Sequence, residues 1–152
     1  MIKVNFIRFV IIFFFITGCG YNPVFSNKEI NFSIYELRLN GNNKLNKIIN
    51  AKLNNYKGSN NQKMFSLQLE TKLNKEVASR DTKGNPTTYR INLETDVFIK
   101  DKKGNTKNKL FFKSIDYNNN ENKSLLKKFE NETSKNLAEK ISDEIIIYLQ
   151  SI

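Results

Sequence analysis

The sequence predicts a two-layer α+β domain in which two helices cover one face of a four-stranded, largely antiparallel sheet. Two observations indicate the layers. Apolar and polar residues alternate through residues 65–77 and 89–100, which is the period of a strand with one face in water. Apolar residues recur at spacings of three and four through residues 45–56 and 118–152, as on a helix that buries one stripe. The expected order of elements is therefore β-α-β-β-β-α.

A strand and a helix open this domain. Residues 30–39 alternate in polarity, but the parity of the apolar positions changes at Tyr35, which predicts either a bulge or a strand buried on both faces. After a turn at residues 40–42, the helix at residues 45–56 opposes its apolar stripe with lysines and asparagines. Because asparagine is a poor helix former, this helix depends on packing for its stability.

Three further strands form an antiparallel meander. A turn-rich loop at residues 79–86 joins the first two of them, and a hairpin turn at residues 101–105 leads to a strand at residues 110–117. The facing of this last strand stays open, because three apolar residues are consecutive at 110–112. The face of the sheet away from the helices is expected to be polar and exposed.

The closing helix has the most regular pattern in the chain. Asn118, with Glu121 three residues later, resembles a capping box and predicts where the helix begins. Apolar residues then recur every three or four positions. The predicted buried stripe comprises Leu125, Phe129, Thr133, Leu137, Ile141, Ile145, Tyr148 and Ile152.

The first 19 residues resemble the start of a bacterial lipoprotein. Lys3 and Arg8 precede a short apolar run at residues 9–16, which is briefer than the roughly 20 residues that span a bilayer. Thr17 and Gly18 then lead to Cys19, the single cysteine, as in a lipobox. We expect residues 1–18 to be a signal peptide, Cys19 to be acylated, residues 19–28 to be a tether and residues 29–152 to form one domain. A buried core strand or an uncleaved anchor helix at the apolar run is the alternative.

Composition restricts the class of partner. The formal charge of +10 falls to +8 if Lys3 and Arg8 leave with the signal peptide, and such an excess favours a polyanion. An exported lipoprotein does not meet chromosomal DNA, so we expect no nucleic acid. The polyanion that such a protein meets is the phosphorylated or carboxylated headgroup of a lipid.

The residue inventory argues against an enzyme. The chain has no histidine, and acylation of Cys19 would leave no thiol, which excludes Ser-His-Asp and Cys-His catalysis, histidine-ligated zinc and disulfides. The glycines form no phosphate-binding loop, so we expect no cofactor and no metal. Glu94 and Asp96 are the best carboxylate pair, but their spacing is typical of a solvated strand face.

Several motifs together resemble one family. They are Cys19-Gly20-Tyr21-Asn22-Pro23, Tyr89-Arg90 before a long strand, the turn at residues 101–104, Ser114-Ile115-Asp116-Tyr117, and Leu137-Ala138 with Ile141 in the closing helix. In order and spacing they resemble the lipopolysaccharide-assembly lipoprotein family, LptE, in its divergent alphaproteobacterial branch. The resemblance covers nearly all of the chain after the signal peptide.

This resemblance implies a function without catalysis. Members of the family plug the lumen of the outer-membrane β-barrel LptD, help it to assemble and contribute to delivering lipopolysaccharide. The implied partners are therefore an LptD-type barrel, lipopolysaccharide and, through acylated Cys19, outer-membrane lipid. The residue after Cys19 is Gly20 and not the aspartate that retains some lipoproteins in the inner membrane. We therefore expect the protein in the outer membrane, facing the periplasm or within the barrel lumen.

The residues themselves suggest where an anion would bind. Arginine is scarce here, and a guanidinium can grip phosphates and carboxylates with two hydrogen bonds. Arg80, Lys83 and Arg90 lie on or beside the loop at residues 79–86, so we expect the lipopolysaccharide contact there. A lipid-binding or scaffold lipoprotein of another envelope machine, for barrel assembly or phospholipid transport, is the alternative. A hydrophobic cavity between helices and sheet would favour it.

Overall fold

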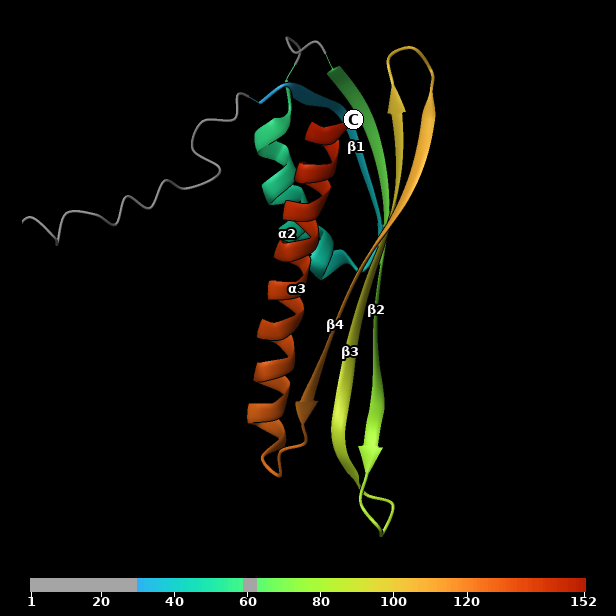
Figure 1. The fold of residues 1–152 in the computed structure, drawn as a ribbon. Coiled ribbons are helices and arrows are strands. Elements are labelled where there is room, and N and C mark those ends of the chain that lie inside the picture. Colours follow the sequence, from blue (N-terminus) through green and yellow to red (C-terminus); the bar gives the residue numbers. More distant parts are fainter. Residues whose placement is uncertain (1–29, 59–62) are drawn as a thin grey trace, which may run out of the picture.

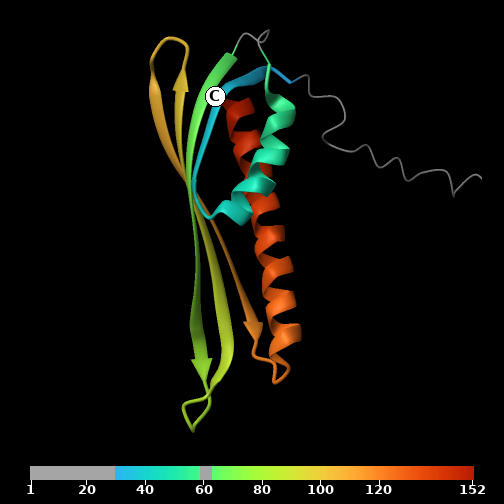
Figure 2. The ribbon, with the colours of Figure 1, turned by 180° about the vertical axis from the view of Figure 1, so that it is seen from behind.

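Four strands form one mixed sheet, and two helices cover one of its faces (Figures 1 and 2). The computed structural model describes residues 30–58 and 63–152. The elements are β1 (Phe32–Gly41), α2 (Asn43–Leu53), the 3-10 turn η1 (Asn54–Tyr56), β2 (Lys63–Arg80), β3 (Pro86–Asp101), β4 (Thr106–Asn118) and α3 (Lys123–Ser151). The predicted fold class and element order are confirmed. The predicted signal peptide, tether and acylated Cys19 lie outside the described residues.

The strands lie in the sheet in the order β1-β2-β3-β4. β1 and β2 are parallel because α2 crosses over between them, whereas β2, β3 and β4 form the predicted antiparallel meander. The register of β1 shifts between Ile34 and Glu36, so the change of parity at Tyr35 is a bulge. Gly41 ends β1 with a φ of +91°, and a Cβ there would lie 2.1 Å from the Thr71 carbonyl oxygen, so only glycine fits.

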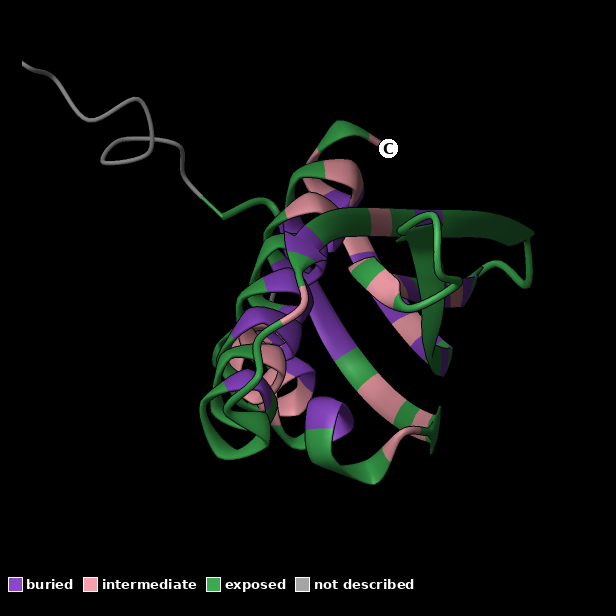
Figure 3. Ribbon diagram, turned by 90° about the horizontal axis from the view of Figure 1, so that it is seen from below, coloured by how far each residue is buried: buried purple, intermediate pink, exposed green. Residues whose placement is uncertain are grey.

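The core lies between the sheet and the two helices, where the facing residues are buried (Figure 3). Each fully buried aliphatic side chain contributes about 1.5–3 kcal/mol to folding. Residues without exposed surface come from both layers: Ile49, Leu53, Leu67, Leu69, Leu93, Val97, Ile141, Ile145 and Leu149. On β2 this burial stops after Thr71, and residues 72–80 are exposed. The β2–β3 hairpin therefore extends beyond the main core.

The predicted start of the last helix is wrong. Asn118 ends β4, where it pairs with Thr88, and Asn122 caps α3 by accepting hydrogen bonds from the backbone N–H groups of Ser124 and Leu125, each at 3.1 Å. Both asparagine side chains can cap a helix, but Asn118 is kept in β4 by its pairing with Thr88. Glu121 therefore precedes the cap instead of completing a capping box.

The predicted buried stripe of this helix is correct only in its C-terminal part. Leu125 and Phe129 are 56% and 48% exposed, whereas Leu126 is buried. A row of residues at spacing four turns by about 40° per step around a helix with 3.6 residues per turn. Counted back from Ile141, Leu125 and Phe129 have therefore rotated off the buried side.

Within the described residues, neither helix has the length and apolar character that crossing a membrane requires.

The outer face of the sheet is less polar than predicted. Phe111 is buried opposite Thr95, which settles the facing of β4 and turns Leu110 and Phe112 outward. These two side chains and Phe98 of β3 are about half exposed, among the charged residues of the same face. This face is thus polar with three apolar side chains on it.

Candidate anion-binding site

The turn of the β2–β3 hairpin is held by one carboxylate. Asp81 accepts hydrogen bonds from the backbone N–H groups of Lys83 at 2.9 Å and Asn85 at 2.8 Å, and from the side-chain amide of Asn85 at 3.1 Å. These bonds, led by that of the Asn85 side chain, hold the pKa of Asp81 below its usual value. Gly84, with a φ of +85°, supplies the left-handed position that the turn requires. The tip therefore has a defined shape.

Two of the three predicted cations lie at this tip. The Arg80 guanidinium donates to the Gly84 carbonyl oxygen at 2.8 Å, which folds the side chain over its own turn. Lys83 is exposed, and no carboxylate among the described residues pairs with it. Both remain open to an anion from solution. Their contact with lipopolysaccharide stays a prediction.

Arg90 lies apart from them, within the sheet. It pairs with Asp116 of β4 through two hydrogen bonds of 2.6 and 2.8 Å, and Glu76 of β2 lies 4.0 Å away. The Asp116 hydrogen bond raises the pKa of Arg90, and the Arg90 hydrogen bond lowers the pKa of Asp116. Pro86, the partner of Arg80, is four residues away, or about 13 Å along the strand. The structure thus brings Arg80 and Lys83 together and assigns Arg90 to a cross-strand ion pair.

Glu94 and Asp96 lie on the outer face of β3. In β2 they face Lys72 and Glu70, which form an ion pair with each other at 3.0 Å. Hydrogen bonding to Glu70 raises the pKa of Lys72. Within residues 30–58 and 63–152 no group of acidic residues could hold a metal ion. The arrangement is a charged strand face in water, as its spacing predicts.

A polar network missed by the sequence analysis joins the sheet to α3 at the base of the hairpin. The Lys75 ammonium pairs with the Glu130 carboxylate and lies 4.0 Å from the centre of the Tyr89 ring. The Tyr117 hydroxyl donates to Glu130 at 2.7 Å. Burial, followed by this hydrogen bond, raises the pKa of Tyr117 well above its usual range. The network supports the hairpin where the apolar core ends.

The Glu130 carboxylate is the centre of this network. Its burial raises its pKa, but hydrogen bonds from Lys75 and Tyr117 outweigh that effect and leave the pKa below its ordinary value of 4.5. The three groups come from β2, β4 and α3, between 13 and 55 residues apart in sequence. Local periodicity does not show that such distant residues meet. A lysine on the inward parity of β2, at position 75, is the one trace of it in the sequence.

Comparison with known proteins identifies the fold. No protein-family model and no curated protein matches the sequence. Among solved structures, the rare lipoprotein B of Shewanella oneidensis matches with a TM-score of 0.60 and 19% identity, over 76% of this chain and 94% of its own. A minor lipoprotein of Acinetobacter baumannii matches with a TM-score of 0.60 and 13% identity, over 82% and 94% of the two chains. A lipoprotein B of Nitrosomonas europaea matches with a TM-score of 0.57 and 10% identity, over 79% and 85%.

These similarities cover most of each chain, so the whole domain is shared. At such identities they establish the fold alone. The chain therefore has the fold of rare lipoprotein B and of the other lipoproteins that it matches.

Proposed function

We propose that this protein is a non-enzymatic lipoprotein of the bacterial outer membrane that plugs an LptD-type β-barrel and helps it to assemble for lipopolysaccharide export. It would be an LptE-type protein of the alphaproteobacterial branch, anchored through acylated Cys19. The observation that carries the proposal is the fold shared with rare lipoprotein B across three quarters of this chain, in a sequence that begins with a lipobox-like segment.

The surface of the domain supports this role. The wall of a barrel lumen is polar, so a plug needs a polar surface that can form wet, hydrogen-bonded contacts. Most of the exposed strand positions carry polar or charged side chains, among which lysine and asparagine are the most frequent. In the middle of the domain, Leu69, Leu93 and Ile141 are fully buried between sheet and helices, so this part of the core is packed, as a plug requires. A domain that encloses a lipid between its layers would instead have a cavity here.

Affinity purification tests the partner. The full chain with a C-terminal tag, extracted from the cells that make it, should bring down a β-barrel of much larger mass. Depletion of the protein should reduce mature barrel and surface lipopolysaccharide together. Recovery of soluble periplasmic proteins alone would contradict the proposal.

Substitution of the cysteine tests the anchor. Cys19→Ser should abolish acylation, measured as loss of the lipid mass on the N-terminal peptide, and should release the protein from membrane fractions. Ser26→Ala, in the predicted tether, is the control and should leave both unchanged. An intact Met1 and an unmodified thiol on the wild-type protein would exclude the lipoprotein assignment.

A further inference from the structure

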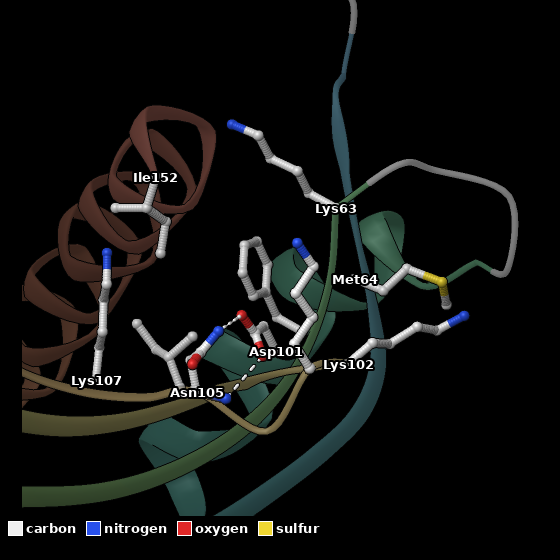
Figure 4. A pocket seen from close by; sticks show the side chains of 10 residues that line it. Lys63, Met64, Asp101, Lys102, Asn105, Lys107 and Ile152 are labelled. Carbon is white, nitrogen blue, oxygen red and sulfur yellow. Dashed lines mark hydrogen bonds between the residues drawn. The ribbon is translucent and has the colours of Figure 1, made fainter.

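A cleft of about 450 Å³ opens at the end of the sheet opposite the β2–β3 hairpin (Figure 4). It lies between the start of β2, the β3–β4 turn and the end of α3. Its lining comprises Lys63, Met64, Phe65, Ile99, Asp101, Lys102, Lys103, Asn105, Lys107 and Ile152. The folded structure therefore joins three segments of the chain that are far apart in sequence.

The rim of this cleft is basic. Four of its lining side chains are lysines, and no carboxylate among the described residues forms an ion pair with any of them. The one acidic side chain, Asp101, accepts hydrogen bonds from the Asn105 side chain at 2.7 Å and the Asn105 backbone N–H at 2.8 Å (Figure 4). The hydrogen bond from the Asn105 side chain is the main cause that holds the pKa of Asp101 below its usual value. The Asp101 carboxylate is therefore engaged within the turn, and the four lysines can pair with an anion from solution.

The floor of the cleft is apolar. Phe65 and Ile99 are buried, at 6% and 3% exposure, and Ile152 is half-buried. Met64, at 8% exposure, lines the cleft from the other side of β2, beside Lys102 (Figure 4). Ammonium groups around an apolar floor match a molecule that carries a phosphate next to hydrocarbon. A free inorganic anion would use the rim and leave the floor exposed.

The cleft lies where the chain from Cys19 enters the domain. β1 begins at Phe32, which pairs with Lys63 of the cleft. Ten residues lie between Cys19 and Ile30, and the eleven residue-to-residue steps that join them reach at most about 40 Å. The Arg80–Lys83 tip lies at the other end of a 16-residue strand, about 50 Å away. A lipid on Cys19 would therefore tether the domain by the end that holds the cleft, with the tip at the far end.

We propose that this cleft binds the phosphate headgroup of an anionic phospholipid in the membrane to which the chain is anchored. The lysines hold the phosphate, and the apolar floor covers the adjoining hydrocarbon. This site is separate from the Arg80–Lys83 tip, and it rests on the proposed anchor at Cys19. Such a contact would orient the domain on its membrane.

Hydrogen exchange on lipid nanodiscs tests the site. The full chain, as cells produce it, is reconstituted on discs of phosphatidylcholine alone and on discs that also contain phosphatidylglycerol. Because each lysine near an anionic surface favours binding about fivefold, peptides spanning residues 63–66 and 99–107 should exchange more slowly on the anionic discs. Peptides of the β2–β3 hairpin should exchange equally on both.

Charge-matched variants locate the effect. Lys63→Gln, Lys102→Gln and Lys107→Gln together should abolish the difference between the two discs. Lys127→Gln, Lys128→Gln and Lys140→Gln together remove the same charge from exposed positions of α3 and should keep it. Unfolding temperatures of both triple variants, measured by circular dichroism, should stay near that of the wild type, because all six side chains are partly or fully exposed.

Three results would overturn the proposal. The first is equal exchange on both discs by an attached wild-type protein. The second is an equal loss in both triple variants, and the third is the same protection from millimolar inorganic phosphate on phosphatidylcholine discs, which would indicate a free-anion site. Failure of the wild-type chain to attach to either disc would refute the anchor, and with it both this proposal and the proposed function.

Discussion

At the scale of single residues, the charges of this domain divide into those with partners in the fold and those without. Arg90 is paired with Asp116, and Lys75 with Glu130, whereas Lys83 has no such partner among the described residues. A paired charge stabilises the fold but has little left to offer a ligand. That arginine is rare in the sequence is therefore a weak guide to a binding site. The strand register is a better one, because it decides which cation faces a carboxylate.

Replacement of Glu130 measures the polar network at the base of the hairpin. Glu130→Gln should lower the free energy of unfolding by about 1.5 kcal/mol at pH 7, because hydrogen bonds to a charged group are lost. The folded-state pKa lies below 4.5, so this contribution is present above that pH and is lost as pH falls through the folded-state value. The difference from wild type in urea unfolding should therefore shrink under acid. Glu121→Gln, at an exposed position, is the control and should change little.

At the scale of elements, the end of β4 sets where α3 can begin. The predicted cap at Asn118 has the right chemistry, yet β4 continues to Asn118 because the pairing with β3 extends to Thr88. The chain then turns, with the Asn119 side chain donating to the Pro86 carbonyl oxygen at 2.8 Å. The helix can begin only after that turn, at the next asparagine that is free to cap it.

Removal of each asparagine side chain distinguishes the two positions. Asn122→Ala should destabilise the protein by about 1 kcal/mol, because two N–H groups of the first turn lose their acceptor. Asn118→Ala should cost clearly less, since its backbone pairing in β4 does not need the side chain. Thermal unfolding and hydrogen exchange at residues 123–126 measure both. An equal or larger loss at Asn118 would mean that the helix begins as the sequence suggests.

At the scale of the whole molecule, the two faces of the layered domain offer different surfaces. One face is the outer side of the sheet, with Phe98, Leu110 and Phe112 about half exposed among charged residues. The opposite face is formed by the helices, where Ile147 is 48% exposed. A plug inside a barrel is surrounded, so both faces should touch the same partner. A scaffold that docks from one side would use only one face.

Photo-crosslinking separates these two arrangements. The photoreactive residue p-benzoylphenylalanine at position 112, and in a second variant at position 147, should crosslink to the same high-mass barrel in cells. Both products should disappear when the barrel is depleted. Crosslinks from position 112 alone would favour the scaffold alternative, in which the apolar side chains of the sheet form the contact.

Much of the fold follows from local pattern. The period of two in residues 65–77 and 89–100 and the helical spacing around Ile141 predict the elements and their order. The change of parity at Tyr35 left a bulge and a strand buried on both faces as alternatives, and the register of β1 shows the bulge. The facing of β4 was open, because Leu110, Phe111 and Phe112 satisfy either parity until Phe111 is placed opposite Thr95. In the first two turns of α3, the apolar residues at a spacing of four predicted a buried stripe, but Leu125 and Phe129 are exposed there.

The sequence alone determined the strand and helix periods, the order of elements and the lipobox-like pattern at Cys19, because each depends on neighbouring residues. Only the tertiary structure decided that Arg90 is paired, that Asn122 begins α3 and that Lys63, Lys102 and Lys107 surround one cleft. Each of these depends on which residues face one another across the sheet. That register is set by the burial of all the strands together, and no short stretch of sequence contains it.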